Sequence, residues 1–169
     1  RVYANMFGAE TTLVPVDEDW SLDFEKIYKS IKSTTKLVVI ENPNGFIGTK
    51  PKKDDVHSLI KYLHNKNILL LIDEAYIYVH KKRSDYIELI NQYNNVIIAQ
   101  TFSKGHGLAG CRFGYIISNP KLIDYISRVR PMHEVGSLAA KAAMWIIDNP
   151  KLLSEMQLGI SENKKYLLK

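Results

Sequence analysis

The stretch Ile68-Leu-Leu-Leu-Ile-Asp-Glu-Ala-Tyr76 begins with an unbroken apolar run and then presents two adjacent carboxylates. Apolar residues that do not alternate with polar ones are typical of a strand that is buried on both faces of a parallel sheet. Runs of the same kind occur at residues 37–40 and 96–99. The sequence therefore predicts a central sheet with parallel strands.

Strand-like and helix-like segments alternate along the whole chain. The predicted strands are Thr12–Val16, Lys36–Glu41, Ile68–Asp73, Asn95–Gln100 and Arg112–Ser118. The predicted helices begin after the capping residue Asp23 and at Pro51, and continue at Asp85–Tyr93, Pro120–Arg130, Val135–Asn149 and Leu152–Leu168. This alternation is characteristic of a layered α/β fold.

Composition excludes several classes of protein. The chain has 169 residues, 46% hydrophobic and 24% charged, which suits one globular domain. A single cysteine, Cys111, excludes an intramolecular disulfide framework and fits a reducing cytoplasm. No apolar run approaches the roughly 20 residues of a membrane span. The net charge is +5, but the lysines are scattered, and the longest basic run, Lys81-Lys82-Arg83, is interpreted as a solvated loop. Neither a membrane nor a nucleic-acid partner is expected.

A second informative stretch is Thr101-Phe-Ser-Lys-Gly-His-Gly-Leu-Ala-Gly-Cys-Arg-Phe-Gly-Tyr115. Lys104 follows a predicted buried strand and lies between Ser103 and a glycine-rich bend. A lysine that is partly desolvated can be neutral near pH 7 and attack a carbonyl group. The hydroxyl groups and Arg112 can hold a phosphate nearby.

Polar groups follow three of the predicted strands. Asp73, Lys104 and the turn Asn42-Pro-Asn44 each come after an apolar run, so they can converge at one edge of the sheet, where ligands of open α/β sheets gather. By themselves, Asp73 and Glu74 also fit the metal-binding acids of a nucleotide hydrolase. The glycines from Gly105 to Gly110 fit a dinucleotide fingerprint by spacing, but they lead into a predicted strand instead of a helix.

Taken together, these stretches resemble the active-site lysine region of fold-type-I pyridoxal-phosphate aminotransferases of class I/II. Within them the chain is most similar to the histidinol-phosphate aminotransferase branch. The resemblance implies a three-layer α/β/α large domain with a mainly parallel sheet, and pyridoxal 5'-phosphate as cofactor. The resemblance also implies that Lys104 forms the Schiff base, that Asp73 pairs with the ring nitrogen and that Tyr76 bonds the phenolic oxygen. The implied cofactor contacts, with no metal ligand, are Asn44, Asp73, Ala75, Tyr76, Thr101, Ser103, Lys104 and Arg112.

The chain departs from the family pattern near Asn42. The pattern reads N-P-x-N-P-T-G, and its second asparagine contacts the phenolic oxygen, whereas here Gly45 takes that position. Asn44 is the candidate to replace the contact, and the alternative is that Asn42 and Asn44 only shape the turn. His133, in the segment that resembles a substrate-side loop, is interpreted as a solvated or capping residue.

The resemblance covers only part of such an enzyme. Residues 1–150 are expected to form a cofactor-binding domain that is incomplete at its N-terminus, and residues 151–169 to begin the helix that leads to a small domain. The expected function is ping-pong amino-group transfer between an amino acid or amino phosphate and a 2-oxo acid, in a cytoplasmic homodimer, with residues 1–169 inactive alone. The alternatives are the nucleotide hydrolase and a non-catalytic remnant of the fold.

Overall fold

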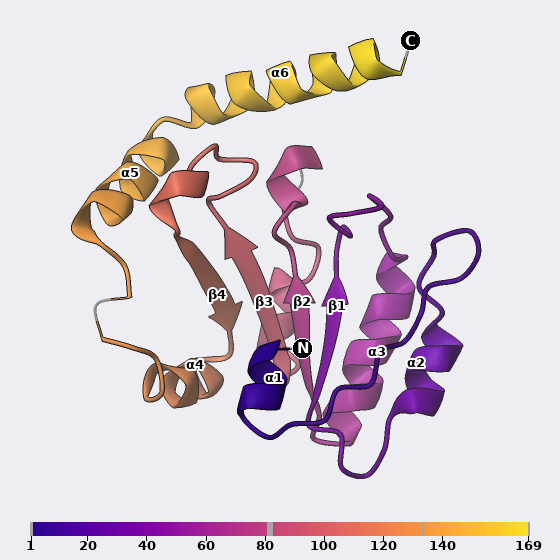
Figure 1. The fold of residues 1–169 in the computed structure, drawn as a ribbon. Helices are drawn as coiled ribbons and strands as arrows, with labels where there is room; N and C mark the ends of the chain where they lie inside the picture. The colour runs from indigo at the N-terminus through magenta and orange to yellow at the C-terminus, as the bar shows by residue number, and fades with distance from the viewer. Residues whose placement is uncertain (1, 81–82, 133, 169) are drawn as a thin grey trace. The chain divides into compact units, whose positions relative to one another are not determined.

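The computed structural model describes residues 2–80, 83–132 and 134–168 (Figure 1). The predicted solvated positions Lys81, Lys82 and His133 lie outside these residues. The chain divides into two compact units, residues 1–35 and residues 36–169. Each unit is described by itself.

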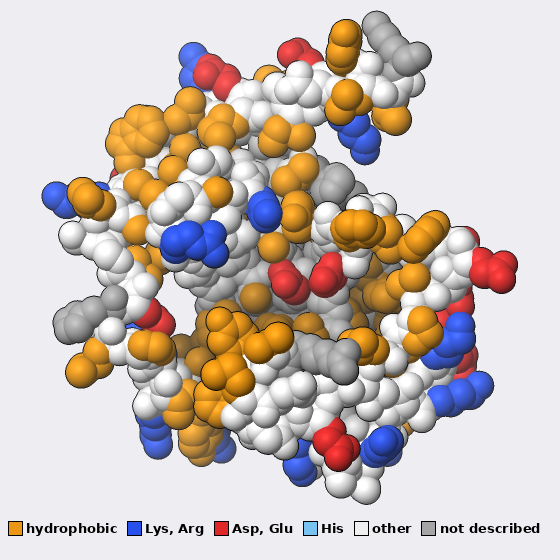
Figure 2. Space-filling model, viewed as in Figure 1, with side chains coloured by type: hydrophobic (Ala, Val, Ile, Leu, Met, Phe, Trp, Pro, Cys, Tyr) orange, Lys and Arg blue, Asp and Glu red, His pale blue; other side chains and the backbone are white. Residues whose placement is uncertain are grey.

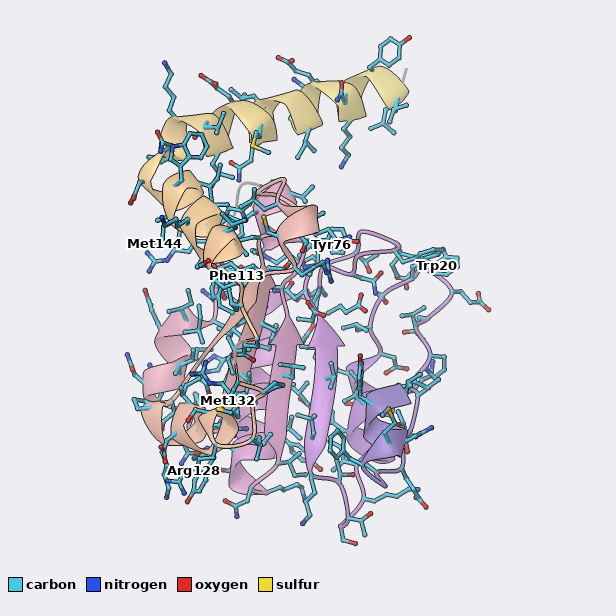
Figure 3. The ribbon with its side chains drawn as sticks, turned by 60° about the vertical axis from the view of Figure 1, so that its left-hand side comes forward. Trp20, Tyr76, Phe113, Arg128, Met132 and Met144 are labelled. Atoms are coloured by element: carbon cyan, nitrogen blue, oxygen red, sulfur yellow. The ribbon has the colours of Figure 1, made fainter. Side chains whose placement is uncertain are left out.

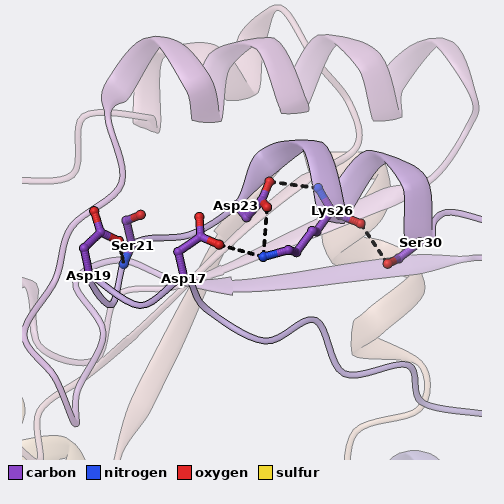
Figure 4. A network of polar contacts seen from close by, with 6 residues as sticks. All are labelled: Asp17, Asp19, Ser21, Asp23, Lys26 and Ser30. Atoms are coloured by element: carbon purple, nitrogen blue, oxygen red, sulfur yellow. Dashed lines mark hydrogen bonds and ion pairs between the residues drawn. The ribbon is translucent and has the colours of Figure 1, made fainter.

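The first unit contains two short helices, α1 (Val2–Met6) and α2 (Phe24–Ser30). Asp23 caps α2 as predicted, because its carboxylate accepts a hydrogen bond of 2.9 Å from the backbone N–H of Lys26. The ammonium of Lys26 also pairs with Asp17 at 2.6 Å and with Asp23 at 3.1 Å (Figure 4). These polar contacts therefore hold the loop before α2 against the first turn of that helix.

The predicted strand at Thr12–Val16 is wrong, because these residues have no regular secondary structure. A strand needs the backbone groups of a partner, and Pro15 has no N–H to donate. The apolar residues of this segment therefore do not by themselves make it a strand.

The second unit is built on a sheet with the strand order β1-β2-β3-β4. The strands are β1 (Leu37–Glu41), β2 (Leu69–Asp73), β3 (Val96–Thr101) and β4 (Gly114–Ser118). The first three are parallel, as predicted, and β4 is antiparallel to β3. The chain returns from β3 to β4 through residues 102–113, without the crossover helix that a parallel pair requires.

Helix α3 (Lys53–Asn65) covers one face of the sheet and supplies the core of this unit. The predicted apolar stripe of Val56, Leu59, Ile60 and Leu63 is confirmed, since all four side chains are fully buried. They pack with the inward side chains of β2, Leu70 and Ile72, which are also fully buried. Each such side chain contributes about 1.5–3 kcal/mol of transfer free energy.

The remaining elements differ from the predictions mainly in length. In place of the predicted helix at Asp85–Tyr93 there is only a 3₁₀ turn, η2 (Ile87–Asn91), because a short segment with several residues of low helix propensity, such as tyrosine, isoleucine and asparagine, forms a weak helix. The other elements are η1 (Ile77–His80), η3 (Ala109–Cys111), α4 (Pro120–Ser127), α5 (Ser137–Asp148) and α6 (Pro150–Leu167). Among the described residues, no helix is long and apolar enough to cross a membrane.

Helices α5 and α6 pack against the loop that follows β3. Phe102, Ala143 and Ile146 form a buried cluster, against which Phe113 and Met156 are partly buried. The rings of Phe102 and Phe113 stack with their centroids 5.0 Å apart. The loop that carries the predicted catalytic lysine is therefore anchored from the helical side.

We expect Leu59→Ala to lower the free energy of unfolding by about 2–5 kcal/mol, because it leaves a cavity between α3 and the sheet. Urea unfolding of the complete protein measures the loss. The control is Ser58→Ala on the exposed face of the same helix, which should change stability by less than about 0.5 kcal/mol. Equal effects of the two variants would contradict the assigned face of α3.

Candidate functional site

The carboxyl ends of the parallel strands lie side by side. Glu41 of β1 is in register with Asp73 of β2, and Asp73 is in register with Ala99 of β3. A hollow of about 270 Å³ opens at this edge, and Figure 2 shows acidic side chains gathered within it. Its lining residues are Glu41, Pro43, Gly45, Phe46, Asp73, Ala75 and Tyr76. Three of the predicted site residues therefore share one concave surface.

Asp73 is held by the turn that follows β2. Its Oδ1 accepts a hydrogen bond of 2.9 Å from the backbone N–H of Ala75, and the side chain is half-buried. This contact fixes the carboxylate at the strand end, on the face where the hollow opens. Ala75 contributes its backbone to the site, which explains how a residue without polar side-chain atoms belongs to it.

Glu74 lies on the opposite face of the sheet from Asp73. Its carboxylate is fully buried and accepts hydrogen bonds from Ser84 and Gln100. Successive side chains of an extended segment point to opposite faces, so the two adjacent carboxylates cannot share a metal ion. No group of three or more metal-ligating side chains is found within residues 2–80, 83–132 and 134–168. The geometry thus disfavours the hydrolase interpretation.

Lys104 and Tyr76 meet beyond the strand ends. The Nζ atom of Lys104 lies 5.1 Å from the centroid of the Tyr76 ring, within cation–π distance. Figure 3 shows Tyr76 just past the end of the sheet, at the edge where the hollow lies. Tyr76 lines the hollow together with Asp73, so Lys104 lies beside a residue of the hollow without lining the hollow itself.

Gly45 leaves the space that the Tyr76 ring occupies. A Cβ atom built at position 45 would lie 2.1 Å from Cε2 of Tyr76, a distance that no real contact allows. The ring therefore packs directly on the backbone of the turn. The slot at which the family pattern has an asparagine is filled here by the face of a tyrosine.

We expect Gly45→Asn to displace the Tyr76 ring and weaken binding of added pyridoxal phosphate, since overpacking of this kind costs about 1–3 kcal/mol. Titration by absorbance in the complete protein measures the affinity. Gly110→Ala is the matched control, because a Cβ atom there meets nothing within 4 Å. Tighter binding by the Gly45→Asn variant would mean that asparagine recovers the family contact without disturbing Tyr76.

Asn44 is engaged within its own turn. Its Nδ2 donates to Oε2 of Glu41 at 2.6 Å, and its Oδ1 accepts from the backbone N–H groups of Phe46 and Ile47, each at 2.9 Å. These bonds shape the loop, as one of the two interpretations of Asn44 required. A cofactor contact by Asn44 stays a prediction. Asn42 is fully buried, and its backbone N–H donates to the Asp73 carbonyl at 2.8 Å.

Of the predicted phosphate-binding residues, Thr101 ends β3, and Ser103 and Arg112 lie on the loop between β3 and β4. Thr101 Oγ1 accepts from the backbone N–H of Ser103 at 3.1 Å and donates to the carbonyl of Phe113 at 3.2 Å. Arg112 is exposed, has a left-handed backbone with φ of 48°, and donates from Nη1 to the carbonyl of Ala109 at 3.2 Å. The Thr101 hydroxyl is already bonded as a donor, whereas the Arg112 guanidinium keeps further N–H groups, and phosphate contacts by these residues stay a prediction.

Sequence reasoning missed two features of this region. Glu41 lines the hollow beside Asp73. Like Asp73, Glu41 is the acidic residue that ends an apolar run, and this shared position was a usable signal. His106 is buried between aromatic rings, with centroids 4.5 Å from Tyr78 and 4.7 Å from Phe102. Burial lowers the pKa of His106, so the neutral ring packs as part of the loop core.

Comparison with known proteins places this geometry in a family. The family model described as aminotransferase class I and II matches residues 1–169. The chain belongs to this family. Histidinol-phosphate aminotransferase 1 of Nitrosococcus oceani is 39% identical over 140 residues, which are 82% of this chain and 37% of that protein. Histidinol-phosphate aminotransferase of Methanococcus aeolicus is 34% identical over 146 residues, 85% of this chain and 38% of that protein. The chain thus spans well under half the length of these relatives.

Solved structures give the same result for the fold. The histidinol-phosphate aminotransferase from Clostridium acetobutylicum matches with a TM-score of 0.90 at 25% identity, over 99% of this chain and 50% of that one. The enzyme from Sinorhizobium meliloti, solved in complex with pyridoxal-5'-phosphate, matches with a TM-score of 0.88 at 27% identity, over 98% of this chain and 45% of that one. The α/β fold class is therefore confirmed as part of the large domain of this family.

Proposed function

We propose that this chain is the lysine-bearing part of a pyridoxal-phosphate-dependent aminotransferase. The complete protein would move an amino group between an amino acid or amino phosphate and a 2-oxo acid by a ping-pong mechanism. One observation carries the proposal: the Lys104 ammonium lies over the ring of Tyr76, which lines the same hollow as Asp73. Membership of the aminotransferase family supports it.

The residues at the hollow fit the cofactor. Asp73 offers a carboxylate for a protonated ring nitrogen, and Tyr76 offers a hydroxyl donor from the neighbouring side of the hollow. Thr101, Ser103 and Arg112 offer donors for a phosphate, and a bidentate guanidinium suits that anion well. The proposed site would thus combine an acceptor for the ring at the end of β2 with donors for the phosphate from Thr101, Ser103 and Arg112.

Pyridoxal phosphate, when bound, supplies an electron sink for the bonding electrons of the substrate α-carbon. The chain supplies the rest. The Asp73 carboxylate favours a protonated partner nitrogen, because an opposite charge nearby stabilises the charged form. Lys104 acts first as the nucleophile and then, once released, as the base and acid that carries a proton at Nζ. Thr101, Ser103 and Arg112 would hold the phosphate end of the cofactor through both half-reactions.

Further proposals concern the complete protein. A cytoplasmic homodimer is supported by the single cysteine, which suits a reducing compartment, and by exposed apolar side chains on α5, such as Leu138 and Trp145. The division into residues 1–150 and residues 151–169 stays a proposal, since α6 begins at Pro150 but residues 36–169 form one compact unit. The names of the relatives favour an amino phosphate as substrate, and histidinol phosphate is the first to assay.

The test uses the complete protein loaded with pyridoxal phosphate. Borohydride reduction followed by peptide mass spectrometry should place the cofactor on Lys104, and initial rates with two substrates should give the parallel double-reciprocal lines of a ping-pong mechanism. Cofactor on a different lysine would overturn the site. Absence of any lysine-bound cofactor, together with hydrolysis of nucleotides, would favour the hydrolase, and absence of both would favour a non-catalytic remnant.

A further inference from the structure

A second set of polar side chains lies behind the hollow, on the opposite face of the sheet. Glu74 is fully buried and Gln100 is 5% exposed. Oε2 of Glu74 accepts a hydrogen bond of 2.7 Å from Nε2 of Gln100, and Oε1 accepts one of 2.9 Å from the hydroxyl of Ser84. The Glu74–Gln100 bond therefore ties the end of β2 to the end of β3.

The same set reaches a third strand. The hydroxyl of Tyr115 on β4 donates to Oε1 of Gln100, so the side-chain amide of Gln100 is bonded on both sides. Burial is the main cause that raises the pKa of Tyr115. We call Glu74, Gln100 and Tyr115 the clasp. The clasp joins the ends of β2, β3 and β4.

Each member of the Glu74–Gln100 pair is the immediate neighbour of a predicted site residue: Asp73, which lines the hollow, and Thr101, a predicted phosphate ligand. Glu74 follows Asp73, and Gln100 precedes Thr101. In addition, the backbone N–H of Glu74 donates to the carbonyl of Ala99 at 2.8 Å. Side chains of neighbouring residues point to opposite faces, so turning either strand end to move Asp73 or Thr101 would break the bonds behind it.

Filling a core with the buried polar side chains of the clasp costs more free energy than filling it with apolar side chains. Burial raises the pKa of Glu74, an effect that the hydrogen bonds from Gln100 and Ser84 oppose. The side chain of Asn42 also faces this carboxylate, although it makes no hydrogen bond of normal geometry with the described residues. Well-packed apolar residues often stabilise a core as well as buried charged groups do. The presence of polar side chains at these buried positions is explained if they fix one arrangement of the strand ends.

We propose that the clasp positions Asp73 and Thr101 for the cofactor, and that Glu74, Gln100 and Tyr115 are positioning residues without contact to the reacting atoms. The inference rests on the proposed function, because it needs a cofactor in the hollow. Removing the residues that orient the ligating side chains of a site commonly weakens ligand binding by about an order of magnitude, because a site tolerates only small displacements.

Asn95 offers a matched control at the other end of the same sheet. It is 4% exposed, and its Nδ2 donates to the carbonyls of Ile68 at 3.0 Å and Ile60 at 3.3 Å. Like Gln100, it is a buried amide with two hydrogen-bonding partners. Asn95 precedes β3, whereas Gln100 lies near the end of that strand. The two amides differ in their distance from the hollow and in their partners, which are backbone carbonyls for Asn95 and the side chains of Glu74 and Tyr115 for Gln100.

The experiment compares Gln100→Leu with Asn95→Leu in the complete protein. Urea unfolding without cofactor should show that both variants lose stability. Absorbance titration with pyridoxal phosphate should show about tenfold weaker binding for Gln100→Leu only, with a shifted pH midpoint of the lysine-bound absorbance band. Equal cofactor affinities and equal midpoints in the two variants would overturn the proposal.

Milder variants keep the test decisive if Gln100→Leu does not fold. Tyr115→Phe removes one hydroxyl and should shift the midpoint in the same direction by a smaller amount. Glu74→Gln retains acceptor and donor atoms and should keep most of the cofactor affinity that Glu74→Leu loses. Unchanged spectra in both Tyr115→Phe and Glu74→Leu would contradict the clasp. A parental protein without a lysine-bound band would instead refute the proposed function.

Discussion

Lys104→Ala should reduce amino transfer by at least 10²–10⁴-fold, the range that a positioned acid–base group contributes, with a further loss from the missing covalent bond. The long-wavelength absorbance of the lysine-bound cofactor should also disappear. The physical reason is position: Lys104 is the lysine that the loop after β3 holds over Tyr76, at 5.1 Å from the ring centroid. Steady-state rates and absorbance spectra of the complete protein measure both effects.

Two further variants separate the possible causes of that loss. Lys104→Arg keeps a positive charge over the Tyr76 ring, but a guanidinium does not lose its proton near neutral pH, so we expect it to be as inactive as the alanine variant. Lys121→Ala removes an exposed lysine at the start of α4 and should behave like the parental protein. Normal turnover by either Lys104 variant would show that another group is the nucleophile.

The parts of the fold that sequence predicted correctly depend on local patterns. The apolar stripe of α3 is buried, and the apolar runs at residues 37–40, 68–72 and 96–99 became β1, β2 and β3. Burial on both faces was wrong for β1, in which Leu37 and Val39 are 48% and 54% exposed. The failures at Thr12–Val16 and Asp85–Tyr93 have the opposite cause. A strand exists only with a partner, and a marginal helix forms only where packing supports it. Neither condition can be read from a single segment.

The features of the site also divide into those that the sequence could predict and those that it could not. Asp73 and Tyr76 line one hollow, and Lys104 lies beside Tyr76. The sequence indicates this proximity, because the parallel strands that precede these residues end at one edge of the sheet. The packing of Tyr76 on Gly45 was not predictable, because it depends on the path of a turn 31 residues away in sequence, and so on tertiary structure. Glu74 was treated as a neighbour of Asp73, although alternation along a strand already implied that the two carboxylates point apart.

Asp73→Asn should leave the fold intact and slow amino transfer strongly. Asparagine retains an Oδ1 atom that can accept the 2.9 Å hydrogen bond from the Ala75 N–H, so the turn after β2 is preserved. The variant loses the negative charge that keeps a partner nitrogen protonated. A charge-assisted contact is worth about 1.5–3 kcal/mol, which corresponds to roughly 10- to 150-fold weaker cofactor binding. The greater loss should appear in kcat, because the electron sink requires the protonated ring.

The neighbouring carboxylate of Glu41 tests whether position or charge alone matters. Glu41→Gln removes the same charge from the same hollow, one strand away, and retains an oxygen for the Asn44 amide. Since Glu41 is bonded to the turn and Asp73 is held at the strand end, we expect Glu41→Gln to reduce kcat far less than Asp73→Asn does. Comparable losses would mean that the hollow needs only negative potential. An Asp73→Asn variant with parental kcat would place the ring elsewhere, because a carboxylate in contact with its nitrogen cannot be replaced by an amide without cost.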